Sequence, residues 1–117
     1  LRMRNKNTHS VTMKKKLRKC RLIFYAYSEL QYKYGCQLDS SSEIAEIKCN
    51  VPIEVADVEG EFTTDFYCIK TTGEIIVREC VYKDKLLKPL TIKMLDASRN
   101  YWLSNGVFDW GIALNED

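Results

Sequence analysis

The sequence predicts a single α/β domain in which a mixed β-sheet is flanked by helices. Three segments rich in β-branched and aromatic residues lie in the middle of the chain, and segments with helical periodicity lie before and after them. The resulting order of helix, three strands, helix and strand indicates a sheet with helices packed against it. A chain of 117 residues is long enough to form one hydrophobic core.

The first helix is predicted to begin at Ser28 or just before it. Gln31 follows Ser28 at the spacing of a capping box, in which the hydroxyl and the amide bind free backbone N–H groups. Apolar residues then recur at helical spacing, and Glu29 falls in the first turn, where a carboxylate favours the helix dipole. The polar run DSSSE, residues 39–43, is expected to end the helix.

The three central strands follow this helix. Residues 47–55 carry an apolar residue at every odd position, which predicts a half-buried strand, and Pro52 places that strand at an edge or at a bend. The segments 62–70 and 74–82, with sequences FTTDFYCIK and EIIVRECVY, are separated by a short turn and predict a central β-hairpin.

The C-terminal part adds a second helix and a last strand. Pro89 suits a first helical position, and the pair Asn105-Gly106 is a typical C-cap signal, so the helix is expected between them. A final short strand is predicted for residues 110–114.

The charge is distributed unevenly along the chain. Residues 1–21 hold nine of the eighteen Lys and Arg residues and no acid, whereas residues 22–117 hold nine basic and sixteen acidic residues. We therefore predict a flexible basic arm, residues 1–21, before a domain of residues 22–117, and a polyanionic partner for the arm. A solvated, disordered tail is the alternative. The predicted nucleic-acid contacts are Lys14, Lys15, Lys16, Arg18, Lys19 and Arg21.

Other classes of protein are disfavoured. The five cysteines are odd in number and form no CxxC motif, which argues against a zinc site or a disulfide framework. No apolar run approaches the roughly 18 residues of a membrane span, and no glycine-rich loop indicates a nucleotide cofactor. Reduced thiols fit a cytoplasmic protein best, with no membrane partner.

The hairpin contains an unusual carboxylate. Asp65 lies in a strand otherwise suited to burial, where a carboxylate must be paired, protonated or bound to a metal. Its neighbour depends on the length of the turn. A turn of residues 72–73 places Asp65 on the same face as Arg78, whereas a turn of residues 71–73 places it opposite Glu79.

Two interpretations of Asp65 remain open on the residues alone. Glu29 can supply another carboxylate from the first helix, and carboxylates that converge beside a cation suit a magnesium site for phosphodiester hydrolysis. The simpler interpretation is an ion pair between Asp65 and Arg78 at a sheet edge. Because isolated carboxylates are common, spacing by itself favours the ion pair.

Five blocks of sequence, taken together and in order, resemble a known family. They are SEL at 28–30, TDFYCI at 64–69, IIVREC at 75–80, KLLKPLTIKMLDASRNYWLSNG at 85–106 and DWGIAL at 109–114. In these blocks the chain is similar to the N-terminal catalytic domain of the TnsA-type endonuclease subunit of heteromeric transposases. The resemblance covers about residues 22–117 and implies a restriction-endonuclease-like fold and cleavage of the 5′ ends of a transposon, beside a separate transposase subunit.

The resemblance also implies roles for individual residues. The family's helix glutamate falls on Glu29 and its aspartate on Asp65, both as ligands of Mg²⁺ or Mn²⁺. The family's Glu/Gln-x-Lys pattern aligns with Ile76, Val77 and Arg78. The backbone carbonyl of Val77 then offers a metal ligand, and Glu79 substitutes for the missing side-chain oxygen if the strand is bulged. Arg78 keeps the positive charge of the family's lysine but is a poor proton-transfer group.

Three functions are consistent with these patterns. The leading hypothesis is a magnesium-dependent DNA endonuclease subunit, with Glu29, Asp65 and Arg78 as catalytic residues and with transposon-end DNA and a transposase as partners. The alternative is a catalytically impaired, nuclease-like subunit that binds DNA or assists assembly. A third possibility is a small acidic interaction domain whose arm binds RNA or an acidic protein, in which Glu29, Asp65 and Arg78 do not cluster.

Overall fold

The protein is described by a computed structural model over residues 11–55 and 62–116. The first ten residues of the predicted basic arm lie outside the described residues. Two α-helices, α1 (Glu29–Ser40) and α2 (Pro89–Ser104), lie within them. Neither of these two described helices is long and apolar enough to cross a membrane.

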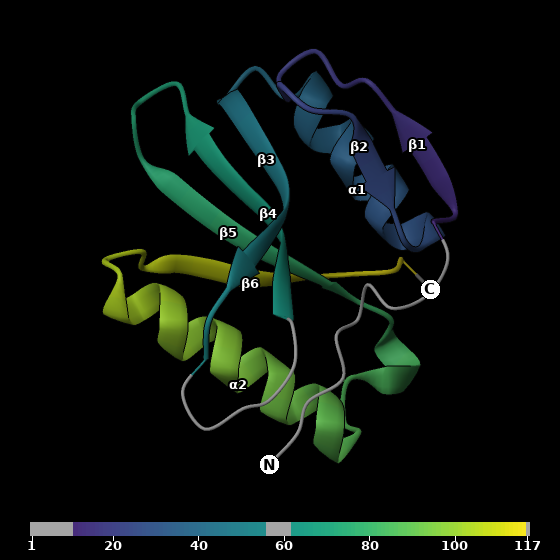
Figure 1. Cartoon of the computed structure of the whole chain (residues 1–117), viewed down its shortest axis with the longest axis vertical. Coiled ribbons are helices and arrows are strands. Elements are labelled where there is room, and N and C mark those ends of the chain that lie inside the picture. Colours follow the sequence, from purple (N-terminus) through teal and green to yellow (C-terminus); the bar gives the residue numbers. More distant parts are fainter. Residues whose placement is uncertain (1–10, 56–61, 117) are drawn as a thin grey trace.

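A four-stranded mixed sheet forms the centre of the fold, in the order β3-β4-β5-β6. Three antiparallel neighbours are followed by one strand that runs parallel to β5. Figure 1 shows α2 on one side of this sheet and α1 on the other. The strands are β3 (Ile44–Ile53), β4 (Phe62–Lys70), β5 (Ile75–Val81) and β6 (Asp109–Leu114). The predicted α/β class, with a mixed sheet and a central hairpin, is therefore confirmed.

A second, two-stranded sheet covers part of α1 and was not predicted. It pairs β1 (Met13–Lys15) with β2 (Phe24–Ala26) in antiparallel fashion. The chain between these strands buries Leu17 and Cys20, which are 0% and 5% exposed. Residues 13–20 therefore belong to the folded domain rather than to an arm that precedes it. The physical reason is that these two apolar side chains alternate with the charges and fill the core beside α1.

Helix α1 begins where the capping box predicts. The Ser28 hydroxyl accepts the N–H of Gln31 at 3.0 Å, and the Gln31 side-chain oxygen accepts the N–H of Tyr27 at 2.9 Å. The helix packs tightly on β2, because a Cβ added to Gly35 would lie only 2.6 Å from the Phe24 ring. A larger residue at position 35 would push α1 away from the sheets.

Strand β3 is an edge strand, which agrees with its proline, but its apolar positions do not all share one face. Ile47 and Cys49 pack in the core beneath α1, whereas Val51 and Ile53 pack in the core beneath α2. The cause is Asn50, whose φ of 52° reverses the alternation of side chains. The prediction of a single buried face is therefore wrong, because a left-handed residue in mid-strand has no strong signal in the hydrophobic pattern.

The remaining elements agree closely with the predictions. The hairpin register pairs Ile69 with Ile75, and the N–H of Lys70 donates to the Glu74 carbonyl at 2.8 Å. The turn is therefore residues 71–73, the longer of the two predicted turns, with Gly73 at a φ of 91°. Pro89 occupies the start of α2, and Asn105 caps its end. Strand β6 begins one residue earlier than expected.

The sheet separates two hydrophobic cores. The core beneath α1 and β2 includes buried Leu17, Phe24, Leu38, Ile47, Phe66 and Cys68. The core beneath α2 includes buried Ile53, Phe62, Val77, Trp102 and Val107.

Candidate functional site

The register of the hairpin decides which residue faces Asp65. The regular pairs run from Ile69 with Ile75, next to the turn, to Phe66 with Arg78, and one step further along the strands Asp65 lies beside Glu79. Here the two carboxylates replace part of the backbone ladder. The N–H of Cys80 donates to Asp65 Oδ2 at 2.7 Å, and the N–H of Asp65 donates to Glu79 Oε1 at 3.1 Å. Each carboxylate therefore binds the backbone of the opposite strand.

Helix α1 contributes Gln31, not Glu29, to this place. Gln31 is 2% exposed, and its amide nitrogen donates to Asn50 Oδ1 at 2.8 Å and, more weakly, to Asp65 Oδ1 at 3.4 Å. Residues two apart on a helix point in very different directions. Because the Gln31 side chain points toward the sheet, the side chain of Glu29, two positions earlier, points away from it.

On the α2 side, the hydrogen bonds continue from Glu79. This side chain is 0% exposed, and its Oε2 accepts the hydroxyl of Ser98 at 2.6 Å. The same hydroxyl oxygen accepts the Trp110 indole N–H at 3.0 Å. We call the connected side chains Gln31, Asn50, Asp65, Glu79 and Ser98 the polar centre. It passes through the sheet from α1 to α2.

Arg78 is held by the last strand rather than by Asp65. Its guanidinium forms an ion pair with Asp109, with Nη2 and Oδ1 2.9 Å apart, and Nη1 donates to the Val77 carbonyl at 2.9 Å. A Cβ at Gly111 would lie 3.3 Å from the guanidinium, so glycine makes room for it. Each residue of the DWG block thus has a structural role. Asp109 pairs with Arg78, Gly111 leaves space for its guanidinium, and the Trp110 indole donates to Ser98 of the polar centre.

Glu29 lies on the solvent side of α1. Its side chain is 66% exposed and pairs with Lys33 at 2.9 Å, one helical turn later. The hydrogen bond and charge of Glu29 raise the pKa of Lys33. Glu29 also lines a cavity of about 460 Å³ with Tyr82 and Asn115.

The predicted metal ligands can be compared with this geometry. Asp65 and Glu79 are neighbours, but Glu29 is at the surface and the Val77 carbonyl accepts Arg78. Within residues 11–55 and 62–116, no three His, Cys, Asp or Glu side chains are grouped so as to hold a metal ion. Both Glu79 oxygens accept hydrogen bonds from the protein. The four predicted ligands therefore do not form one ligand set in this arrangement, and magnesium stays a prediction.

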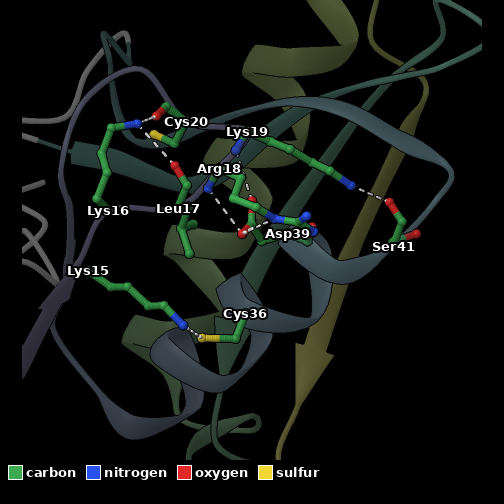
Figure 2. Close-up of polar contacts among 9 residues, drawn as sticks. All are labelled: Lys15, Lys16, Leu17, Arg18, Lys19, Cys20, Cys36, Asp39 and Ser41. Atoms are coloured by element: carbon green, nitrogen blue, oxygen red, sulfur yellow. Dashed lines mark hydrogen bonds and ion pairs between the residues drawn. The ribbon is translucent and has the colours of Figure 1, made fainter.

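The second group of predicted functional residues is the run of basic residues 14–21, which we call the basic segment. Leu17 and Cys20 anchor it in the core, while Lys14, Lys15 and Lys16 are exposed. The Lys16 ammonium bends back to the carbonyls of Leu17 and Cys20. The cations are therefore carried on a folded surface of defined shape (Figure 2).

Asp39, near the end of α1, fixes the turn of the basic segment. Its carboxylate accepts the N–H groups of Arg18 at 3.1 Å and Lys19 at 2.9 Å (Figure 2). The Arg18 side chain lies 3.8 Å from the same carboxylate and is 78% exposed. Burial raises the pKa of Asp39, but these N–H groups and the two positive charges outweigh it, so the pKa lies below its ordinary value. The Lys19 ammonium donates to the carbonyl of Ser41.

Several residues of this region were not singled out as site residues from the sequence. Gln31 was noted only as a cap, and Ser98 is a small polar residue on the otherwise apolar sheet-facing side of α2. Asp109 was noted only within the DWG block. A polar residue among the buried positions of a helix, such as Ser98, can be recognised in the sequence, but the sequence does not show which residue it binds.

Comparison with known protein families and with curated proteins finds no match to this chain.

Proposed function

We propose that this protein is a nuclease-like DNA-binding subunit of a transposition complex, with a restriction-endonuclease-like fold and a carboxylate pair that serves the fold rather than hydrolysis. The observation that carries the proposal is the basic segment, whose exposed cations are anchored by Leu17, Cys20 and Asp39. A mixed sheet between two helices is consistent with such a fold.

The basic segment suits the DNA backbone. Lys14, Lys15 and Arg21 are exposed, and the Arg18 side chain is 78% exposed beside Asp39. Cations of this kind bind phosphates and release counterions, which makes the affinity depend on salt but carries no sequence information. Choice of the transposon end would then come from the transposase partner.

The state of the carboxylates supports a structural role. Glu79 is fully buried, and its two oxygens accept the N–H of Asp65 and the hydroxyl of Ser98. Arg78, the expected stabiliser of a scissile phosphate, is already paired with Asp109. A reaction at this place would have to break several of these buried bonds before DNA could reach the carboxylates.

A second candidate is the magnesium-dependent endonuclease, and one observation favours it. Asp65 and Glu79 lie together on neighbouring strands, beside Gln31 from α1. Magnesium in phosphoryl-transfer sites is often bound by one or two carboxylates together with substrate phosphate. In this case Asp65 and Glu79 would hold the ion, which would supply charge neutralisation and an activated water.

DNA binding is tested by the fluorescence anisotropy of labelled transposon-end duplex over a series of salt concentrations. We expect Lys14→Ala combined with Arg21→Ala to weaken binding and to lower the slope of log K against log salt by about 2, because each lost phosphate contact removes about 0.9. The matched control replaces Lys93 and Arg99, two exposed cations of α2, by alanine. Equal loss in both double variants would show that the basic segment is not the DNA-binding surface.

Cleavage separates the two candidates. Supercoiled DNA that carries transposon ends is incubated with the protein and Mg²⁺ or Mn²⁺, with and without the transposase, beside an Asp65→Asn variant. The DNA-binding proposal predicts the same products for both proteins. Nicking by the natural protein that disappears in Asp65→Asn would establish the endonuclease instead.

A further inference from the structure

A groove of about 930 Å³ lies between residues 20–27 and the outer edge of β3, residues 46–52. Its two walls are joined by hydrogen bonds. The N–H of Ile47 donates to the Lys19 carbonyl at 2.9 Å, and the Asn50 side chain donates to the Tyr25 carbonyl at 2.8 Å. The groove is thus formed by the fold itself and needs no partner to open it.

The groove continues the surface of the basic segment. In the β1–β2 pairing, Lys14 lies directly opposite Tyr25, and directly paired residues in a sheet share a face. Tyr25 is 43% exposed and lines the groove, together with Arg21 from the end of the basic segment. Lys48 and Glu46 of β3 line the other wall and offset each other in charge. The charge of this region is therefore positive where it meets the basic segment.

Apolar and aromatic side chains are exposed in the same place. Leu22 is 77% exposed, Ile23 is 49% exposed, and both line the groove with Tyr25. Contacts to duplex phosphates are made by cations and do not account for exposed Leu22, Ile23 and Tyr25. Cations beside exposed rings and aliphatic groups are typical of surfaces on which unpaired bases stack while the backbone is neutralised.

We propose that this groove binds unpaired nucleotides of a DNA whose adjoining duplex lies on the basic segment. Tyr25 offers a face for base stacking, Leu22 and Ile23 offer apolar contacts, and Arg21 lies where the phosphates of the strand enter. The proposal rests on the DNA-binding function above and specifies its substrate as a duplex with a single-stranded extension. A protein segment in the same groove is the competing occupant, but the continuity with the basic segment favours nucleic acid.

The test compares two labelled DNAs in fluorescence anisotropy: a blunt duplex of about 20 base pairs and the same duplex with a single-stranded extension of about six nucleotides. We expect the extended DNA to bind about tenfold more tightly, as stacking of one or two bases would give. Tyr25→Ala and, separately, Leu22→Ala should remove most of this gain and leave the affinity for blunt duplex unchanged. Both side chains are exposed, so the variants should fold. Phe108→Ala, at a residue 79% exposed before β6, is the control and should keep the gain.

The outcomes separate this inference from the proposed function. Equal affinity for blunt and extended DNA in the natural protein would overturn the inference and leave duplex binding intact. A gain that persists in both groove variants would also overturn it. If these variants in addition no longer bind the transposase, the groove binds protein instead. Absence of binding to either DNA would overturn the proposed function itself.

Discussion

The polar centre and the basic segment are both rich in charged or polar groups, but they use them in opposite ways. In the polar centre, Asp65 and Glu79 are 4% and 0% exposed and accept hydrogen bonds from the opposite strand or from α2. In the basic segment, apolar Leu17 and Cys20 are buried so that the cations around them stay at the surface. The comparison teaches that the charges which attract attention in the strands stabilise the fold, whereas those available to a partner lie near the N-terminus.

The largest expected effect tests the structural role of the polar centre. Glu79→Ala should lower the free energy of unfolding by about 4 kcal/mol, because it leaves a cavity and two buried donors, Asp65 N–H and Ser98 O–H, without an acceptor. Urea denaturation measures this. Glu43→Ala, at an exposed turn, should change stability by less than about 0.5 kcal/mol. Equal free energies of unfolding for the two variants would mean that Glu79 does not stabilise the folded protein.

Next in size is the anchor of the basic segment. Leu17→Ala removes a fully buried side chain and should cost about 3 kcal/mol of stability. It should also weaken DNA binding at temperatures well below the unfolding midpoint, since the cations lose their fixed positions. Val11→Ala, at a residue 42% exposed, is the control for both measurements. A variant that loses stability but binds DNA normally would show that anchoring does not matter for binding.

A smaller effect, of about 2 kcal/mol, is expected for Asp39→Ala, which leaves the N–H groups of Arg18 and Lys19 without their acceptor. The difference in the free energy of unfolding between the natural protein and this variant should depend on pH. Because the folded pKa of Asp39 lies below the ordinary value of 3.8, its contribution is complete above that value and is lost as the pH falls through the folded pKa. Chemical denaturation between pH 7 and acid pH measures this, and a difference that does not shrink in acid would contradict the role of the charge.

The smallest effect separates Glu29 from the polar centre. Glu29→Ala removes an exposed carboxylate whose partner is Lys33, so the unfolding midpoint and the DNA affinity should not change measurably. Thermal unfolding and anisotropy are sufficient for the test. A large loss of DNA cleavage in this variant, in an assay where the natural protein cuts, would return Glu29 to the catalytic set.

Much of the fold was predictable because its signals are local. The Ser28 and Gln31 cap, the glycine turn of the hairpin and the Pro89 start of α2 each depend on residues a few positions apart. The β1–β2 sheet was missed because each strand has only three residues and two of those in β1 are lysines, so neither strand has a hydrophobic pattern long enough to recognise. The break at Asn50 was missed for a related reason, since alternation in sequence equals alternation in space only while φ stays in the β region.

The candidate site was predictable in part. The sequence identified Asp65 and offered both Arg78 and Glu79 as its neighbour, and the register selected Glu79. It also identified the basic residues, although not that they belong to the folded domain. The partner of Arg78 was out of reach, because Asp109 lies thirty-one positions away and meets it only through the parallel pairing of β5 with β6.

By itself, then, the sequence determined both helices, the central hairpin and the last strand, and it showed which charges had to be explained, since caps, turns and periodicity act between near neighbours in the chain. Only the tertiary structure decided what those charges do. Strand register and the reversal at Asn50 turn Gln31, Asp65 and Glu79 toward one another. Glu29 and most of the cations of the basic segment stay at the surface. The physical reason is that a buried carboxylate takes the hydrogen-bond donors that packing brings to it, and packing joins segments far apart in the chain.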